Sequence, residues 1–113
     1  MRCFQILTVA GSLGLLGIGT ALHADVAAQH DAVFVKAFSN GTQVGWRVTG
    51  LVTDSPMVRL GFKEDDIILS YKKRTVVGDS KLLFEMNYEI EEGTCGPIAI
   101  KRGNSSVVLT CKK

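Results

Sequence analysis

The sequence predicts one small α+β domain, and three observations support this. The chain has 113 residues, a length that suits a single hydrophobic core. Its hydrophobic fraction of 46% and charged fraction of 21% are typical of a folded globular protein. Short strand-like segments flank two helical segments without the regular strand–helix alternation of a parallel sheet, so we expect an antiparallel sheet with helices packed on it.

The first 24 residues have the pattern of a signal peptide. Arg2 is the only charged residue before Asp25, and residues 3–22 are apolar or small. Small residues permit cleavage before Asp25, which we favour, or before Gln29. An uncleaved membrane anchor is the alternative, because about 20 apolar residues can span a bilayer.

After this leader we expect a flexible entry segment over residues 25–32 and the folded domain over residues 33–113. The domain should begin with a strand over residues 33–39 and a turn at Asn40-Gly41. A second strand is expected over residues 46–52, with a bulge at Gly50.

A short helix should follow, because Ser55 can cap it, Pro56 suits its first position and Gly61 can end it. Further strands are expected at residues 67–71 and 75–77, joined by a turn at Lys72-Lys73.

The longer helix is expected to begin after Asp79 and to end near Gly93. Its core-facing residues are Leu82, Leu83, Met86 and Ile90. Phe84 and Tyr88 lie outside this apolar face, so they either cover neighbouring surface or line a groove.

A hairpin should close the domain, because Gly103-Asn104 is a two-residue turn signal. This turn places Ile100 opposite Val107 and Ile98 opposite Leu109, which pairs apolar residues with each other.

Two cysteines remain once the leader with Cys3 is removed, and an exported chain meets conditions in which disulfides persist. We therefore expect a Cys95–Cys111 bridge, with two buried thiols as the alternative. The hairpin register puts Cys111 opposite Gly96, so the bridge requires a bend at Gly96-Pro97.

Catalytic and metal-binding patterns are not evident, so we expect no enzyme and no cofactor. His30 is the only histidine after the leader, which leaves the serines without an obvious base. Residues 64–66 are three consecutive acids that lack the spacing of a calcium loop, and we interpret them as a turn with solvated carboxylates. The formal charge of +2 and the interleaving of basic and acidic residues also argue against nucleic-acid binding.

The chain resembles the PDZ domains of bacterial exported proteins. Val44-Gly45-Trp46 is similar to the family's apolar–Gly–apolar peptide-binding loop. A second motif follows the family's order of a Ser-Pro helix start, a Gly-hydrophobic pair, an acidic turn and an Ile-rich strand. It consists of Ser55-Pro56, Gly61-Phe62, Asp65-Asp66 and residues 67–69. Gln43, Asp65 and Lys72-Lys73 depart from the family's usual residues.

The resemblance implies a partly open antiparallel β-barrel of five to six strands with one short and one longer helix. It implies that a peptide adds beside the strand beginning at Trp46, with its carboxylate held by the amides of Val44, Gly45 and Trp46. The last side chain of the peptide would enter a pocket between this strand and the long helix. The pocket candidates are Val44, Trp46, Val48, Ser80, Leu83, Phe84 and Asn87. Val48 and Leu83 are alternatively core residues, and Trp46 either faces the groove or lies in the core.

We therefore expect a non-catalytic periplasmic or secreted module that binds the C-terminus or an extended segment of a partner protein. If the leader is not cleaved, the module faces the periplasm from the inner membrane. The alternative is a docking component of a secretion or protease assembly that does not read a free carboxylate.

Overall fold

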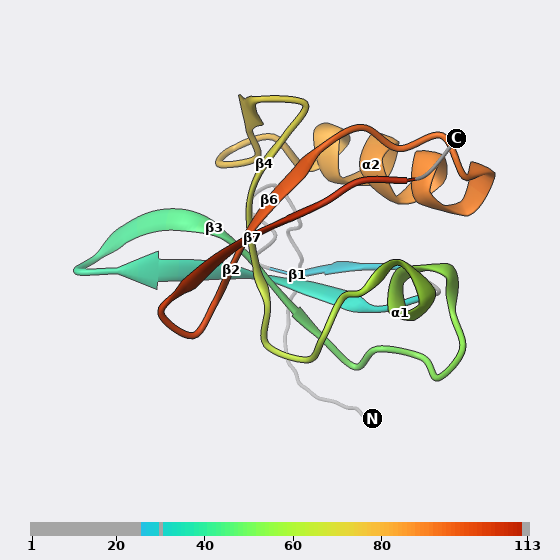
Figure 1. Ribbon diagram of the computed structural model, residues 1–113. Helices are drawn as coiled ribbons and strands as arrows, with labels where there is room; N and C mark the ends of the chain where they lie inside the picture. The colour runs from blue at the N-terminus through green and yellow to red at the C-terminus, as the bar shows by residue number, and fades with distance from the viewer. Residues whose placement is uncertain (1–25, 30, 112–113) are drawn as a thin grey trace, which may run out of the picture.

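The computed structural model describes residues 26–29 and 31–111, so the expected leader lies outside the described residues (Figure 1). The α+β class with one short and one longer helix is confirmed. The sheet is open and antiparallel, and it has seven strands instead of five or six. The strands are β1 Val26–Ala28, β2 Val33–Ser39, β3 Thr42–Thr49, β4 Ile67–Tyr71, β5 Arg74–Thr75, β6 Ile98–Arg102 and β7 Ser105–Leu109, and the helices are α1 Pro56–Leu60 and α2 Ser80–Glu92.

The order of strands places β3 inside the sheet. The order is β1-β2-β3-β4-β6-β7, with β5 paired to β4. β3 pairs with β2 on one side and with β4, at Trp46 and Arg47, on the other. In Figure 1 the β2–β3 hairpin extends to the left, away from the two helices.

The expected entry segment contains a strand. β1 pairs antiparallel with β2, with Ala27 opposite Phe34. Three residues of the segment that we expected to be flexible therefore form one of the edge strands of the sheet.

The second expected strand is displaced toward the N-terminus. β3 begins at Thr42 because Asn40 and Gly41 both have positive φ, 53° and 79°, and connect β2 directly to β3. The prediction of a bulge at Gly50 is wrong. Gly50 lies after β3 with φ 61°, and the register shift between β2 and β3 occurs between Ala37 and Phe38.

Both helices have the expected caps. The Ser55 hydroxyl accepts a hydrogen bond from the Val58 amide at 3.3 Å, and Pro56 opens α1. The Asp79 carboxylate accepts one from the Leu82 amide at 3.1 Å at the start of α2. As expected, α2 ends at Gly93, which has the left-handed conformation.

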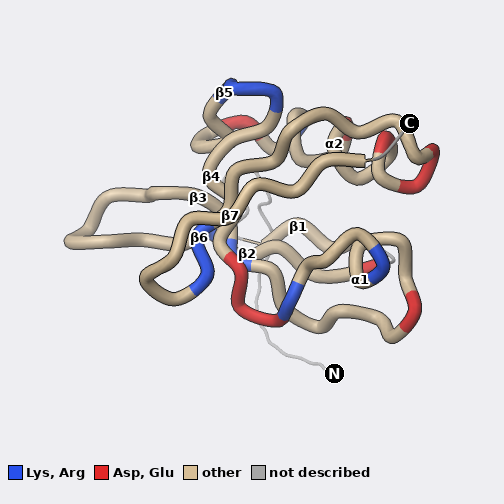
Figure 2. Tube along the Cα trace, viewed as in Figure 1, with Lys and Arg blue, Asp and Glu red and all other residues tan. Residues whose placement is uncertain are grey.

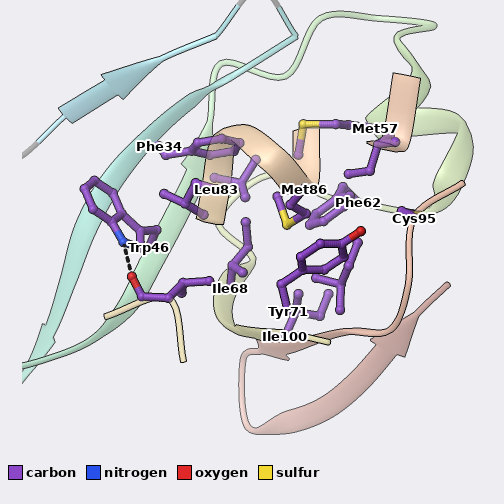
Figure 3. Close-up of a cluster of buried hydrophobic side chains, with 14 of the residues drawn as sticks. Phe34, Trp46, Met57, Phe62, Ile68, Tyr71, Leu83, Met86, Cys95 and Ile100 are labelled. Atoms are coloured by element: carbon purple, nitrogen blue, oxygen red, sulfur yellow. Dashed lines mark hydrogen bonds between the residues drawn. The ribbon is translucent and has the colours of Figure 1, made fainter. Parts of the chain in front are cut away.

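The core lies between the sheet and the helices (Figure 3). The four expected core residues of α2 are buried, and Ile68 and Tyr71 of β4 are fully buried beside them. The cluster also includes residues of β2, β3, β6 and α1 and of the segments between elements. The predicted apolar face of the long helix is thereby confirmed.

The acidic turn before β4 differs from the solvated turn we expected. Asp66 is only 1% exposed and forms a two-pronged ion pair with Arg102, in which both N···O distances are 2.9 Å. Arg102 also donates to the Gly61 carbonyl at 2.8 Å. The ion pair joins the turn before β4 to β6, and the bond to Gly61 joins the end of α1 to β6. The neighbouring Asp65 is exposed and has φ 71°, a left-handed conformation that Asp tolerates.

Glu64 in the same turn is exposed but not free. Its carboxylate accepts hydrogen bonds from the Thr49 hydroxyl at 2.8 Å and the Gly50 amide at 2.7 Å. It also accepts one from the Leu51 amide at 3.2 Å. These bonds, the one from Thr49 first, lower the pKa of Glu64. Glu64 thus ties the chain after β3 to the turn before β4.

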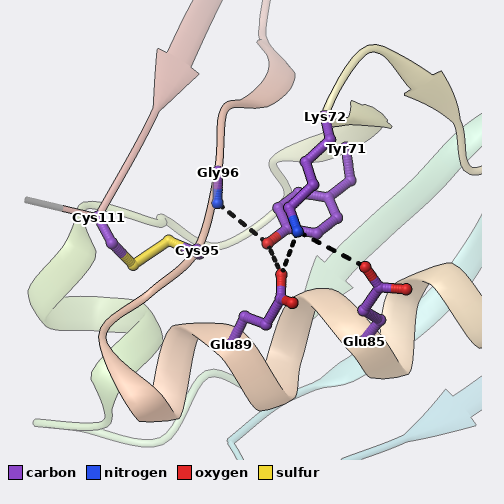
Figure 4. Close-up of polar contacts among 7 residues, drawn as sticks. All are labelled: Tyr71, Lys72, Glu85, Glu89, Cys95, Gly96 and Cys111. Carbon is purple, nitrogen blue, oxygen red and sulfur yellow. Dashed lines mark hydrogen bonds and ion pairs between the residues drawn. A yellow bond between two sulfur atoms is a disulfide. The ribbon is translucent and has the colours of Figure 1, made fainter.

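The closing hairpin has the predicted register. Ile98 lies opposite Leu109 and Ile100 opposite Val107. The Cys95–Cys111 disulfide is present, with a Cα–Cα distance of 5.1 Å (Figure 4). Since β6 begins only at Ile98, the preceding residues leave the ladder, and the Cys111 amide donates to the Cys95 carbonyl at 3.3 Å.

Asp66→Asn should destabilise the fold by about 2 kcal/mol, because it leaves the Arg102 guanidinium without its counter-charge. Asp65→Asn is the matched control, since it removes the adjacent exposed carboxylate and Asn also tolerates positive φ. Urea unfolding at neutral pH measures both. Equal effects of the two substitutions would contradict the structural role of the Asp66–Arg102 pair.

Candidate functional site

The three residues expected to form a carboxylate-binding loop lie inside a strand. Val44, Gly45 and Trp46 belong to β3, where Gly45 pairs with Ala37 and Trp46 with Lys36 of β2. The expected loop at these residues is therefore wrong, because the Asn40-Gly41 turn ends three residues before Val44. The amides of β3 belong to a sheet ladder and do not converge on one anion.

Gly45 has a packing role. A Cβ at this position would lie 2.1 Å from the carbonyl oxygen of Ile68. Its φ is not in the left-handed region, so the conformational freedom expected for Gly45 is not used. The missing side chain lets the backbone of β4 approach β3 closely.

Trp46 lies in the core. Its side chain is 2% exposed, and its indole Nε1 donates to the Val76 carbonyl at 2.9 Å (Figure 3). The Lys36 ammonium lies 6.0 Å from the centre of the ring. The alternative in which Trp46 faces a groove does not hold, because a core carbonyl satisfies the indole N–H. Val48 and Leu83 are fully buried in the same cluster, as our alternative for them stated.

The remaining groove candidates differ in their accessibility. Val44 is half-buried, and Ser80 is exposed. Phe84 is 46% exposed, and Tyr88, one turn further along α2, is 65% exposed. Asn87 is 3% exposed, and its Nδ2 makes no hydrogen bond within the described part of the chain. The surface of α2 therefore exposes two aromatic side chains.

The sheet order shows which strand edges are paired. β3 has neighbours on both sides, so a peptide cannot add beside the segment that begins at Trp46. β2 is the next strand outward, and its outer edge is covered by β1 only at residues 33–35. Residues 36–39 of β2 have no strand on that side among the described residues.

Sequence reasoning missed this edge because residues 26–28 also fit a cleavage site for the leader. A run of small and apolar residues just before a strand was the available signal. Its pairing partner could not be known without the order of strands.

A polar cluster joins the end of β4 to α2 (Figure 4). The Tyr71 hydroxyl donates to the Glu89 carboxylate and accepts a hydrogen bond from the Gly96 amide at 3.0 Å. The Lys72 ammonium lies 3.0 Å from Glu89 and 3.7 Å from Glu85.

The pKa shifts of the side chains in this cluster favour a structural role. Burial, and then the hydrogen bond to Glu89, raises the pKa of Tyr71. The hydrogen bonds from Tyr71 and Lys72 lower the pKa of Glu89, and the bond to Glu89 raises that of Lys72. The phenol and the ammonium therefore stay protonated at neutral pH, and neither is prepared as a base or nucleophile.

A hollow of about 560 Å³ lies between α1, the end of α2 and the end of β7. Arg59, Glu91 and Cys111 are among the residues that line it. None of the groove candidates from the sequence does so.

Lys and Arg lie in short separate stretches among acids (Figure 2). Residues 26–29 and 31–111 contain no group of three His, Cys, Asp or Glu side chains placed to hold a metal ion. None of the helices that the structure describes has the length and apolar character needed to cross a membrane.

Comparison of the chain with protein-family models, curated proteins and solved structures gives no significant match.

Gly45→Ala should destabilise the fold by about 2 kcal/mol, because the new methyl group would overlap the Ile68 carbonyl. Gly96→Ala is the matched control, since its methyl group would meet only the flexible Lys72 side chain. Thermal unfolding measures both variants. A stable Gly45→Ala protein would contradict the close-approach role.

Proposed function

We propose that this domain is a non-catalytic module of the PDZ type that binds an extended segment of another protein by β-strand addition. Two features support the proposal. The elements from β2 onward follow the order strand, strand, short helix, strand, strand, longer helix and hairpin. The Ser55-Pro56 motif opens the short helix as the resemblance implies.

The outer edge of β2 is the observation that carries the proposal. β1 pairs there as an antiparallel strand, so the position and direction of this edge suit an added strand. The backbone of a bound segment would supply the hydrogen bonds, and alternate side chains would supply specificity. The residue opposite Phe34 would face the core, as Ala27 does.

The edge favours an extended internal segment over a free C-terminus. Carboxylate binding was expected from the amides of residues 44–46, and these residues lie in β3. Reading of a terminal carboxylate is therefore an outcome to be tested, together with the partner's sequence preference.

The disulfide supports a compartment in which the module would meet its partner. Disulfides persist in oxidising compartments outside the cytoplasm. The partner of a periplasmic or secreted module would be another protein of the cell envelope or the surrounding medium.

Docking through α2 is the second candidate function. Phe84 and Tyr88 are exposed one turn apart on this helix, and exposed aromatics are enriched at protein interfaces. Such a module would be a component of a secretion or protease assembly and would not need the edge of β2.

An amide NMR titration of the full chain tests the proposal. The probes are synthetic seven-residue peptides rich in Val, Thr and Ala, each with a free and an amidated C-terminus. We expect shifts concentrated at residues 33–39 with both forms, because strand addition uses the backbone. Peptides with proline at alternate positions are the control, since they lack the amides that pair with β2.

Shifts confined to α2, and lost in a Phe84→Ala/Tyr88→Ala variant, would favour the docking function instead. Shifts present only with the free carboxylate would show that the module reads C-termini. Complete absence of shifts at residues 33–39 would contradict strand addition.

A further inference from the structure

The chain at the end of β3 directs three hydrogen-bond donors at one carboxylate group. The Thr49 hydroxyl and the Gly50 amide donate to one oxygen of the Glu64 carboxylate, at 2.8 and 2.7 Å. The Leu51 amide donates to the other oxygen at 3.2 Å. Both oxygens are therefore bound, as a site for a carboxylate requires. We call Thr49, Gly50 and Leu51 the nest.

The backbone conformation of Gly50 creates the nest. Gly50 has φ 61°, which lies in the left-handed region. A left-handed residue in a turn lets successive amides point toward the same place, and such concave groups of amides bind anions. A Cβ at Gly50 would approach only the Val33 side chain, at 3.9 Å. The glycine is thus explained by its conformation and not by close packing.

The nest is held in place without the Glu64 side chain. The Asp65 amide donates to the Val48 carbonyl at 2.8 Å, and the Val48 amide donates to the Asp66 carbonyl at 2.8 Å. These backbone bonds join the end of β3 to the turn before β4, and the ion pair of Asp66 with Arg102 fixes the same turn. The carboxylate of Glu64 can therefore leave the nest while the two segments stay together.

The nest can be reached from solvent. Gly50 and Glu64 are exposed, and Thr49 and Leu51 are half-buried. Since the Glu64 carboxylate is exposed, it can be hydrated when it leaves the nest. Its hydrogen bonds lower its pKa, so at neutral pH the nest holds an anion. A carboxylate from another molecule has the same charge and the same pair of oxygens.

We propose that the nest is a binding site for a carboxylate of a partner molecule, and that Glu64 is an intramolecular ligand which this carboxylate replaces. The partner's carboxylate is a peptide C-terminus or the side chain of an Asp or Glu residue. The site lies at the end of β3, apart from residues 44–46. The inference does not depend on strand addition at β2.

Charge and shape both favour a carboxylate in the nest. Hydrogen bonds to an ionised acceptor are about twice as strong as bonds between neutral groups. A carboxamide of the same shape has one oxygen, and its NH₂ group would meet one of the donors of the nest. Acetamide is therefore the neutral counterpart of acetate, and it separates recognition of a carboxylate from simple filling of the nest.

The full chain with Glu64→Ala tests the inference, because this substitution empties the nest and keeps its three donors. The probe is sodium acetate, with acetamide as its neutral control. The NMR shifts of the Gly50 and Leu51 amides give the dissociation constant at fixed pH and ionic strength, since salt screens surface charges. Asp65→Asn is the matched control, because it removes the adjacent exposed carboxylate and leaves Glu64 in the nest.

We expect acetate to bind Glu64→Ala at least about tenfold more tightly than wild type, because apparent affinity scales with the fraction of molecules whose nest is free. Asp65→Asn should bind acetate like wild type, and acetamide should bind none of the proteins. Adding Thr49→Val to Glu64→Ala should weaken acetate binding, since it removes one donor and keeps the shape of the side chain.

Equal acetate affinity in wild type, Glu64→Ala and Asp65→Asn would overturn the inference. Equal binding of acetate and acetamide would also overturn it. Glu64→Gln keeps the length of the side chain and removes its charge. It decides the question in the same way if Glu64→Ala does not fold.

Two blocked peptides distinguish the sources of the carboxylate in the Glu64→Ala protein. Acetyl-Ala-Ala-Ala with a free C-terminus has only a terminal carboxylate, and acetyl-Ala-Glu-Ala amide has only a side-chain carboxylate. Saturable shifts at residues 49–51 with either peptide support the inference and identify the source, and acetyl-Ala-Ala-Ala amide is the blank. Binding of neither peptide would overturn the inference. Strand addition is measured at residues 33–39, so failure of one proposal is distinguishable from failure of the other.

Discussion

The close approach of β4 to β3 at Gly45 is the constraint on which the rest of the structure depends. Because Gly45 has no Cβ, the Ile68 carbonyl can lie against it, and β4 pairs with β3 at Trp46 and Arg47. β4 in turn carries β5 and β6. At these two residues β3 is thus paired on both sides, and β2 lies between β3 and the edge strand β1.

Polar contacts keep the elements around this centre in place. The Asp66–Arg102 pair ties the turn after α1 to β6, and the disulfide ties the end of α2 to the end of β7. Tyr71 and Glu89 join β4 to α2. Comparable links to β1 are absent among the described residues apart from its pairing with β2 and the packing of Ala27. The molecule thus combines a well-connected interior with an edge strand, β1, that pairs with β2.

Local sequence signals predicted most of the fold. The caps at Ser55 and Asp79, the turn at Gly103-Asn104 and the disulfide pairing depend on residues near in sequence or on a fixed register, and all are confirmed. The burial of Asp66 could not be predicted, because its partner Arg102 lies 36 residues away. For the same reason the acidic turn was interpreted as solvated.

The candidate site was harder to predict than the fold. A Gly between apolar residues fits a peptide-binding loop, but it also fits a close approach of two strands, and only the position of Ile68 separates these roles. The indole N–H of Trp46 could find a hydrogen-bond acceptor in a groove or in the core. The sequence does not distinguish these, because the acceptor, the Val76 carbonyl, lies 30 residues away. The pairing of β1 with β2 was hidden because its three residues also fit a cleavage site.

Native-state amide hydrogen exchange tests most directly whether β1 is held more weakly than the rest of the sheet. The amides of Gln29 and Val48 both donate backbone hydrogen bonds of 2.8 Å, but the first closes β1 onto β2 and the second lies in the core. We expect the Gln29 amide to exchange through local opening, much faster than the Val48 amide and with little dependence on denaturant. Exchange of both amides at the rate of global unfolding would show that β1 is an integral strand and would contradict the account.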